Sequence, residues 1–286
     1  MSKVIGVVLK PGVRDALVAL REVQEAAPEA TFIGEAEGHH AVPDGLHGVE
    51  RVDPATFERR AELVLVLGGD GTLIHAASLL PNRLVPVLGV NLGHIGFLTE
   101  VARDEMLDVL PRALEGTLPS SDRMRLDVEV RRGDQVLIKR RVLNDAVVAM
   151  RALARIATYR LTQHEEPVTT VRGDGVIVAT PTGSTAYSLA SGGPIIAPQL
   201  EAIAITPICP HQLTQRPLVV PPTGDLIVTL DSDSTVFASL DGHFGQDLER
   251  GDAIVVRKAT VPSRLLNVPW RNYFQTLRTK LRWGEG

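Results

Sequence analysis

The stretch LVLVLGGDGTLIHAA, residues 63–77, decides the fold class of this chain. Its first five residues are all apolar, which is typical of a parallel strand that is covered on both faces. The glycine-rich segment GGDGT follows at once, and a stretch that reads as a helix comes after it. A strand that ends in glycines and leads into a helix predicts an α/β unit.

Alternating strands and helices continue on both sides of this stretch. We expect strands at residues 3–9, 31–33, 63–67 and 85–90, and helices at residues 13–27, 72–80 and 105–115. A polar loop that contains histidine and glycine separates the second strand from the third. Residues 1–119 are therefore predicted to form an α/β, Rossmann-like domain with a parallel, doubly wound sheet.

The pattern changes after the linker-like segment at residues 116–121. Residues 125–130 alternate between polar and apolar, RRGD at 131–134 forms a turn, and residues 135–142 run back, which indicates a β-hairpin. Further strands are expected at residues 175–179, 225–230, 235–240 and 253–257. We therefore predict a β-rich domain at residues 120–267. The tail at 268–286, helical near 273–283, is predicted to pack back on the first domain.

The bulk composition is that of a globular protein: 286 residues, 44% hydrophobic and 22% charged. With 30 basic and 34 acidic side chains, the net charge of −4 gives no reason to expect a nucleic-acid or anionic-membrane partner. The single cysteine, Cys209, can form neither an internal disulfide nor a cysteine metal cluster. No apolar run approaches the ~18 residues of a membrane span, and no signal peptide is evident. These features predict a cytoplasmic protein.

The acidic glycine corner at residues 68–72 has two interpretations. Backbone N–H groups at a helix start, and glycines that let a ligand approach, suit a phosphate. Asp70, however, repels phosphate unless a metal or a proton transfer gives the carboxylate a task. No Walker A motif occurs, and residues 89–96 lack the spacing of a dinucleotide-binding G-x-G-x-x-G. Asp70 is either a turn or capping residue or a functional acid.

A second polar loop lies further along the chain. The strand predicted at 175–179 leads into TPTGSTAYSLASGGP at residues 180–194, which is dense in hydroxyl groups and glycine. Such a loop offers several small donors to a polar ligand, and Tyr187 can pack against a base or a sugar. A Ser/Thr-rich helix cap is the alternative, although one cap needs fewer of these residues.

Taken together, these motifs resemble those of bacterial-type, ATP-dependent NAD kinases. The first motif alone is shared with diacylglycerol-type lipid kinases and, more loosely, with phosphofructokinases, whereas the ordered set is more specific. The set comprises GGDGT (68–72), NLGHIGFLT (91–99), LND (143–145), DG (174–175) with the loop 180–194, TPICPH (206–211) and DG (241–242).

The resemblance implies a role for each matching residue. Asp70 would be the general base and, with Gly71, would contact the dinucleotide, and His75 would lie near its phosphates. Asn144 and Asp145 would hold the adenine side of NAD, and His243 stands where many members have Gln. The phosphate loop would include Gly68, Gly69 and Thr72. The residues that would wrap the adenosine and ribose are Thr185, Ala186, Tyr187, Ser188, Leu189 and Ala190. Those expected around the ligand, partly at a subunit interface, are Arg155, Arg172 and Asp174.

The implied reaction transfers the γ-phosphoryl group of ATP to the 2′-hydroxyl of the adenosine ribose of NAD⁺, giving NADP⁺ and ADP. A carboxylate with a pKa near ~4 is too weak to deprotonate a free alcohol, so Asp70 would orient the hydroxyl and accept its proton late. Mg²⁺ would bridge ATP oxygens without a protein cage. The resemblance also implies a homodimer or homotetramer. The alternatives are a diacylglycerol-type lipid kinase, and a non-catalytic NADP-binding regulator, against which Asp70 argues.

Three other features favour structural roles. The eight histidines, including His39 and His40 in a predicted loop, lack the clustered spacing of a zinc site, so surface or packing roles are expected. The basic residues from Arg123 to Arg141 are interrupted by acids, which indicates a solvated hairpin face. Cys209 is predicted to pack in a tight turn. Ser184 is not embedded in G-x-S-x-G, which argues against a serine hydrolase.

Overall fold

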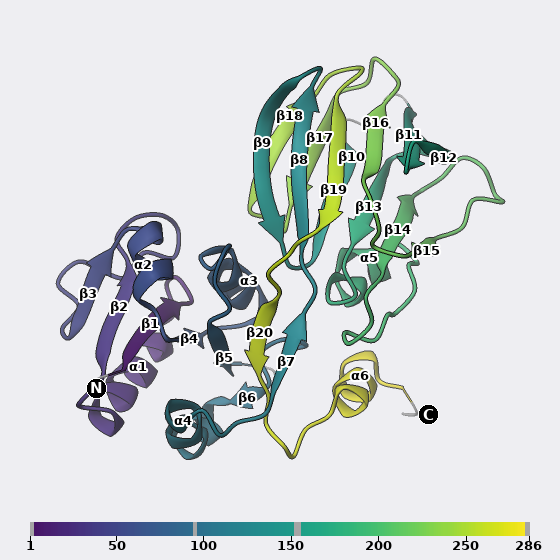
Figure 1. The fold of residues 1–286 in the computed structure, drawn as a ribbon. Coiled ribbons are helices and arrows are strands. Elements are labelled where there is room, and N and C mark those ends of the chain that lie inside the picture. The colour runs from purple at the N-terminus through teal and green to yellow at the C-terminus, as the bar shows by residue number, and fades with distance from the viewer. Residues whose placement is uncertain (1–2, 94–95, 152–155, 284–286) are drawn as a thin grey trace. The chain divides into compact units, whose positions relative to one another are not determined.

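The computed structural model describes residues 3–93, 96–151 and 156–283, and Figure 1 labels its helices and strands. The chain divides into two compact units: unit 1 is Met1–Asp122 with Ser263–Gly286, and unit 2 is Arg123–Pro262. The chain therefore crosses between the units twice, after Asp122 and after Pro262. Residues 263–267, expected in the β-rich domain, belong to unit 1.

Unit 1 is built on one sheet with the order β3-β2-β1-β4-β5-β20-β7, and β6 pairs with β5. The pairs β1·β2, β1·β4, β2·β3, β4·β5, β5·β6 and β5·β20 are all parallel. The predicted α/β class is thus confirmed. The strands are β1 (Val4–Leu9), β2 (Thr31–Glu35), β3 (Val49–Val52), β4 (Leu63–Leu67), β5 (Pro86–Asn91), β6 (Val101–Ala102), β7 (Ser120–Arg123) and β20 (Ser263–Leu266).

The direction in which strands are added reverses between β1 and β4, which lie side by side at the centre of the sheet. All five residues of β4 have 0% exposure, as their continuous apolar run predicted. In an open parallel sheet, the crevice at the carboxyl ends of the strands where the order reverses is the usual ligand site. Because GGDGT directly follows β4, the glycine corner begins at this crevice.

The helices of unit 1 match the prediction except for one. Residues 49–60, expected as part of a polar loop, contain β3 and α2 instead. The side chain of Asp53 caps α2 by accepting a 2.9 Å hydrogen bond from the Thr56 amide, and Pro54 occupies the first turn. The helices are α1 (Arg14–Ala26), α2 (Pro54–Arg60), α3 (Asp70–Ser78), the 3₁₀ turn η1 (Arg103–Glu105), α4 (Met106–Glu115) and α6 (Tyr273–Leu281).

The end of the chain returns to unit 1, as predicted for the tail. β20 adds a parallel strand beside β5, with Leu265 opposite Val87. Beyond it, Trp270 Nε1 donates to Glu105 Oε1 over 3.0 Å, and Arg271 Nη2 donates to the same oxygen over 2.9 Å. A strand and a set of polar contacts therefore anchor this segment.

Unit 2 consists of two antiparallel six-stranded sheets, β15-β14-β13-β10-β17-β18 and β12-β11-β16-β19-β8-β9. The hairpin predicted around residue 132 is confirmed as β8 paired with β9. One apolar core contains residues of both sheets, such as Val128 and Tyr159 of the second and Val178 of the first.

The bounds in unit 2 are β8 (Leu126–Arg132), β9 (Gln135–Val142), β10 (Asp145–Met150), β11 (Ala157–Gln163), β12 (Glu166–Gly173), β13 (Gly175–Ala179), β14 (Ile203–Ile208), β15 (Leu218–Val220), β16 (Leu226–Leu230), β17 (Val236–Leu240), β18 (Phe244–Leu248) and β19 (Ala253–Lys258). The short helical turns are η2 (Gly183–Thr185) and α5 (Tyr187–Ala190).

The basic hairpin is not simply a solvated face. Arg123 and Arg125 are buried, with 6% and 2% exposure. On β8, Glu129 pairs with Lys139 at 2.8 Å and also with Arg131. Hydrogen bonds from Lys139 and Arg131 lower the pKa of Glu129 to about 2, although burial opposes the change. The expectation of a fully solvated face was therefore wrong for the two buried arginines, and carboxylates of the same unit neutralise part of the remaining charge.

Replacing Glu129 by Gln is expected to lower the free energy of unfolding at neutral pH by about 1 kcal/mol, because an ion-pair network loses its central charge. The pKa of Glu129 is depressed from its usual 4.5, so its contribution is present above that value and disappears as the pH falls through about 2. Urea unfolding of both proteins at several pH values measures the difference. The exposed turn residue Asp134, changed to Asn, is the matched control. An equal loss of the free energy of unfolding in Glu129→Gln and Asp134→Asn would contradict a stabilising role of the ion-pair network.

Candidate active site

The start of α3 offers open backbone at the carboxyl edge of the sheet. Its N-cap residue is Gly69, which provides no side-chain cap. A Cβ atom built on Gly69 or Gly71 would meet nothing within 4 Å, whereas one on Gly68 would lie 2.5 Å from Thr72 Oγ1. Gly68 is thus needed for packing against the buried Thr72, while Gly69 and Gly71 leave room for a ligand to approach a helix N-terminus.

Asp70, the predicted base, is immobilised by the segment at residues 97–99. Its Oδ2 accepts a 2.8 Å hydrogen bond from the Phe97 amide. Its Oδ1 accepts 3.1 Å hydrogen bonds from the amides of Leu98 and Thr99, and a 3.0 Å bond from Thr99 Oγ1. The carboxylate therefore holds a separate loop in place. Neither a local turn nor a helix cap describes this role.

The loop that Asp70 holds belongs to the predicted motif at residues 91–99. Asn91 Nδ2 donates to Thr99 Oγ1 over 2.7 Å, and Asn91 Oδ1 accepts from the Gly93 amide over 2.8 Å. A Cβ atom on Gly96 would lie 2.6 Å from Asp70 Oδ2, so the carboxylate needs a glycine there. Residues 94 and 95 lie outside the described part of the chain. The motif was predicted from the sequence, but the sequence indicated no role for Asn91 or Thr99.

His75, which is half-buried, contacts two buried polar side chains, Glu35 and His40, and no local pattern in the sequence predicts these contacts. Its Nε2 contacts the carboxylate of Glu35, the last residue of β2, which is 6% exposed. The ring of His40 stacks on that of His75, with centroids 4.2 Å apart and planes 18° from parallel. His40 Nδ1 lies 3.1 Å from the Leu9 carbonyl oxygen, so it carries the proton of that hydrogen bond. Leu9 and Glu35 end β1 and β2, which puts these contacts at the carboxyl edge of the sheet.

In unit 2, the predicted Asn144-Asp145 pair and the loop at 180–194 lie against each other. Thr180 Oγ1 donates to the Leu143 carbonyl over 2.6 Å, and the Thr180 amide donates to the Asn144 carbonyl over 2.8 Å. Gly183 packs so closely that a Cβ atom there would overlap the Asn144 backbone, with the Asn144 Cα only 2.7 Å away. The structure thus brings together two motifs that are more than thirty residues apart.

This junction contains acceptors without partners. Asn144 Oδ1 and Thr182 Oγ1 are buried and have no hydrogen-bond partner among the residues that the structure describes. Burial, together with the like charge of Asp241, raises the pKa of Asp145 to about 7. Buried polar groups are normally paired, so orphaned ones indicate a ligand whose donors complete them. The junction therefore reads as a binding site for a ligand rich in N–H and O–H groups.

Residues 185–190, which are expected to wrap the adenosine and ribose, differ in their exposure to solvent. Tyr187 is 47% exposed and available to a ligand. Ser188 is buried, and its hydroxyl pairs with that of Thr206 at 2.9 Å, so it supports the loop from behind. Thr185, Ala186 and Leu189 are half-buried, and Ala190 is exposed.

Arg172 and Asp174 lie at the other end of β13 within one chain. Asp145 pairs with Ala179, whereas Ala149 pairs with Gly175, the residue after Asp174. The five residues of β13 span about 16 Å at the usual rise of a strand. One chain therefore does not bring Arg172 and Asp174 to Asn144. His243 is exposed, and Arg155 falls outside the described residues.

The described residues show neither a metal centre nor a membrane-spanning helix. In those ranges, no group of three or more His, Cys, Asp or Glu side chains is arranged to hold a metal ion. Among the helices described, none has the length and apolarity that a membrane crossing requires. Cys209, predicted to pack in a tight turn, is instead exposed at a positive φ of 44°, at a bend that directly follows β14, and Pro207 and Ile208 belong to that strand.

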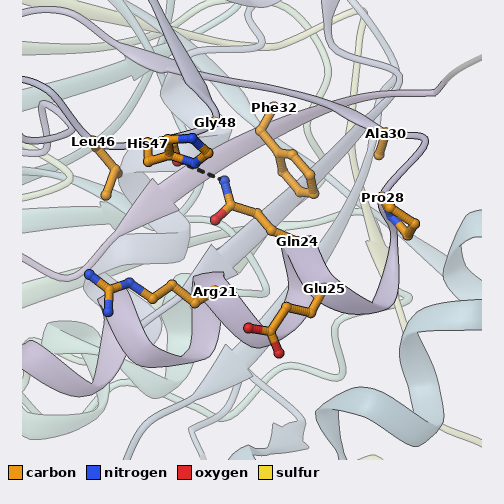
Figure 2. A pocket seen from close by; sticks show the side chains of 9 residues that line it. All are labelled: Arg21, Gln24, Glu25, Pro28, Ala30, Phe32, Leu46, His47 and Gly48. Carbon is orange, nitrogen blue, oxygen red and sulfur yellow. Dashed lines mark hydrogen bonds between the residues drawn. The ribbon is translucent and has the colours of Figure 1, made fainter.

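Unit 1 also contains a cavity of about 520 Å³, and Figure 2 shows the residues that line it. Gln24 Nε2 donates to the His47 carbonyl across it over 3.0 Å. Phe32 comes from the amino half of β2, whereas the glycine corner lies at the carboxyl ends of the strands. The residues that line this cavity are Arg21, Gln24, Glu25, Pro28, Ala30, Phe32, Leu46, His47 and Gly48.

An open parallel sheet with an acidic glycine corner at its order reversal, followed by a β unit with orphaned acceptors, is the arrangement of a two-unit protein that binds a polar, phosphate-bearing ligand. Two family models match the chain: the ATP-NAD kinase N-terminal domain over residues 14–118 and the ATP-NAD kinase C-terminal domain over residues 143–268. The chain therefore belongs to the ATP-NAD kinase family, and it is an enzyme of that family.

Individual relatives agree with this assignment. The NAD kinase of Geobacter metallireducens is 49% identical over 250 residues, 87% of each chain. That of Geobacter sulfurreducens is 48% identical over 241 residues, 84% of this chain and 85% of the relative. The crystal structure of yeast NADH kinase complexed with NADH has a TM-score of 0.89 at 27% identity and covers 100% of this chain and 89% of its own. An NAD kinase from Archaeoglobus fulgidus in complex with ATP shares the fold, with a TM-score of 0.76 at 24% identity over 98% of each chain.

Proposed function

We propose that this enzyme transfers the γ-phosphoryl group of ATP to the 2′-hydroxyl of the adenosine ribose of NAD⁺, forming NADP⁺ and ADP. The observation that carries the proposal is the set of orphaned acceptors at Asn144 and Thr182, beside the ionisable carboxyl of Asp145. The adenosine half of a dinucleotide has amino and hydroxyl groups that can donate to these acceptors. The names of the relatives and the NADH and ATP in the two solved structures support the same substrates.

The binding roles follow from exposure and from unsatisfied acceptors. Asn144 and Asp145 accept donors of the adenosine, and the ring of Tyr187 stacks on the base. The backbone of Gly69 and Gly71 receives phosphate oxygens at the start of α3. His75 presents its ring near the phosphates, with its tautomer set by the carboxylate of Glu35. The roles inferred for Thr185, Ser188, Leu189, Ala190 and His243 rest on the resemblance.

Asp70 serves as the base through Oδ2. This oxygen accepts one hydrogen bond from protein, whereas Oδ1 accepts three, so Oδ2 keeps room for the proton of a sugar hydroxyl. The carboxylate orients the hydroxyl and takes its proton as the new O–P bond forms. Mg²⁺ bound to ATP would offset phosphate charge during the transfer.

Because β13 separates Arg172 and Asp174 from Asn144 within one chain, we assign Arg172 and Asp174 to the site of a neighbouring subunit in a homodimer or homotetramer. The role of Arg155 rests on the resemblance. A cytoplasmic location remains a prediction from the sequence.

A coupled assay tests the reaction. The purified protein, given NAD⁺ and MgATP, is expected to form NADP⁺, which an NADP-specific dehydrogenase reports. A parallel reaction with diacylglycerol in detergent micelles tests the lipid-kinase alternative. Phosphate transfer to lipid and not to NAD⁺ would refute the proposal, and tight NADP⁺ binding without any transfer would favour a regulator.

The KM for NAD⁺ is expected to fall about tenfold between about pH 6 and pH 8. The ionised Asp145 is the form that accepts ligand donors, and burial with the charge of Asp241 raises its pKa to about 7. Raising the pH through this value therefore increases the binding-competent fraction. Initial rates at saturating ATP measure the effect, and Asp145→Asn is expected to lose the pH dependence.

The stability of the ligand-free protein should change with pH in the opposite direction: it should fall as the Asp145 carboxyl ionises. The pKa of Asp145 in the folded state is raised above its usual 3.8, so its contribution to stability is complete below that value and is lost as the pH rises through about 7. Asp145→Asn should unfold at a temperature at least about 2–4 °C above the parent protein at about pH 8. An unchanged melting temperature at that pH would contradict the buried carboxylate.

A further inference from the structure

Arg125, which sequence reasoning placed on a solvated face, is the largest fully buried side chain in the described part of the protein. Its Nε donates to the Val261 carbonyl over 2.9 Å, and its Nη2 donates to the Pro262 carbonyl over 3.3 Å. Its own carbonyl accepts from the Ala259 amide over 2.9 Å. Arg125 therefore joins the first residues of unit 2 to its last ones.

A buried guanidinium is poorly screened by solvent, so its positive charge acts strongly on ionisable groups around it. The carboxyl of Asp241 is one of the groups affected. Burial raises the pKa of Asp241 to about 6, against the hydrogen bonds that it accepts and the positive charge of Arg125, both of which lower it. Arg125 therefore favours the ionised form of the Asp241 carboxyl.

The Asp241 carboxylate accepts hydrogen bonds from the turn at the start of β10. Its Oδ2 accepts a 2.7 Å hydrogen bond from the Leu143 amide, and its Oδ1 accepts from the amides of Asn144 at 2.8 Å and Asp145 at 3.1 Å. Three successive amides thus converge on one side chain. Asp241 itself adopts a φ of 51°, a conformation that residues other than glycine rarely take. Such strain persists only where surrounding contacts enforce it.

We propose that Asp241 is a positioning residue for dinucleotide binding: its carboxylate orients the Leu143–Asp145 turn toward NAD⁺ through three hydrogen bonds, and the buried charge of Arg125 favours the ionised form that makes them. The inference rests on the proposed function, since Asn144 and Asp145 are its ligand contacts. Asp241 does not need to touch the substrate, and Arg125 acts through the charge of Asp241.

The charges around this turn also affect the pH dependence of the KM for NAD⁺. Asp241 faces the like charge of Asp145 and the opposite charge of Arg125. Removing the charge of Asp241 therefore lowers the pKa of Asp145, because the repulsion disappears. The pH at which the KM for NAD⁺ changes should move to a lower value, a result that a purely structural role of Asp241 does not produce.

The test uses Asp241→Asn in the full chain. An amide keeps one acceptor oxygen and turns an N–H₂ group toward backbone N–H donors, so part of the grip is lost. We expect the KM for NAD⁺ to rise about 10-fold or more, with kcat and the KM for ATP within about 3-fold of the parent values. The pH midpoint of the NAD⁺ KM should fall. Asp233→Asn, in the exposed loop before β17, is the matched control and should leave all three parameters unchanged.

Arg125 is tested by two variants. Arg125→Met removes the charge and should raise the KM for NAD⁺, whereas Arg125→Lys keeps the charge and should recover part of the loss. If Arg125→Met does not fold, Arg125→Gln, a polar side chain without the charge, takes its place in the comparison with Arg125→Lys. A folded Arg125→Met with an unchanged KM for NAD⁺ would overturn the role of Arg125.

Hydrogen exchange separates this inference from the proposed function. In Asp241→Asn without ligand, the amides of Leu143, Asn144 and Asp145 should exchange faster, while those of β13 remain protected. Unchanged exchange, or faster exchange with an unchanged KM for NAD⁺, would overturn the positioning role. Failure of the parent protein to form NADP⁺ would instead refute the proposed function, whatever the exchange of the turn shows.

Discussion

Asp70→Asn is expected to lower kcat by about 10²- to 10⁴-fold, the usual worth of a general base. The amide cannot accept the proton of the ribose hydroxyl at Oδ2. It also turns an N–H₂ group toward amide donors of residues 97–99, so the loop that Asp70 holds loosens and the melting temperature falls. Steady-state kinetics with NAD⁺ and MgATP, together with thermal unfolding, measure the two effects.

Thr99→Val separates proton acceptance from loop anchoring. The substitution removes the 3.0 Å hydrogen bond from Thr99 Oγ1 to Asp70 Oδ1 and the 2.7 Å bond from Asn91, but leaves the carboxylate and its three amide donors. We expect a lower melting temperature and a kcat within about 10-fold of the parent value, a loss far below that for a missing base. If Thr99→Val lost as much turnover as Asp70→Asn, anchoring of the loop would explain the effect and Asp70 would not be the base.

Gly183→Ala is expected to disrupt the dinucleotide junction. The added Cβ would overlap the backbone of Asn144, and backbone cannot rotate away as a side chain can. The Asn144 carbonyl also accepts from the Thr180 amide, so both segments must shift. We expect a loss of about 1–3 kcal/mol in the free energy of unfolding and at least a 10-fold rise in the KM for NAD⁺, with the KM for ATP little changed.

Gly93→Ala is the matched control for the stability of Gly183→Ala. A Cβ on Gly93 would make only an ordinary 3.8 Å contact with Asn91 Oδ1, and its φ is not positive. The same chemical change should therefore leave the melting temperature near that of the parent protein. A Gly183→Ala protein with parental stability and parental KM for NAD⁺ would show that the two loops do not need this close approach.

The elements that were predicted well are those with a local signal. β4 was predicted at the bounds observed, because a strand buried on both faces is a continuous apolar run. The hairpin of β8 and β9 followed from alternation around a turn. α2 was missed although Asp53 and Pro54 form a recognisable helix start, since the histidine- and glycine-rich stretch before it suggested a loop.

The site was predicted in its motifs but not in its contacts. Asp70, Asn144 and Asp145 were chosen from their residue types and their resemblance to a family. No local signal in the sequence indicated three contacts. Asp70 accepts hydrogen bonds from residues 97–99, His75 contacts Glu35, and Asp241 accepts hydrogen bonds from the turn at 143–145. Each of these contacts joins positions that lie 27 or more residues apart in the chain.

By itself, the sequence determined the α/β class of the first unit, the β-rich second unit, and the loops where glycines, hydroxyls and acids gather, because these depend on periodicity and local backbone preferences. Only the tertiary structure decided which carboxylates are anchored and which acceptors are left for a ligand. Arg125 shows the reason most plainly. Alternation along β8 suggested a solvated side chain, yet its partners are carbonyls 136 and 137 residues away, and burial is decided by packing that no local pattern encodes.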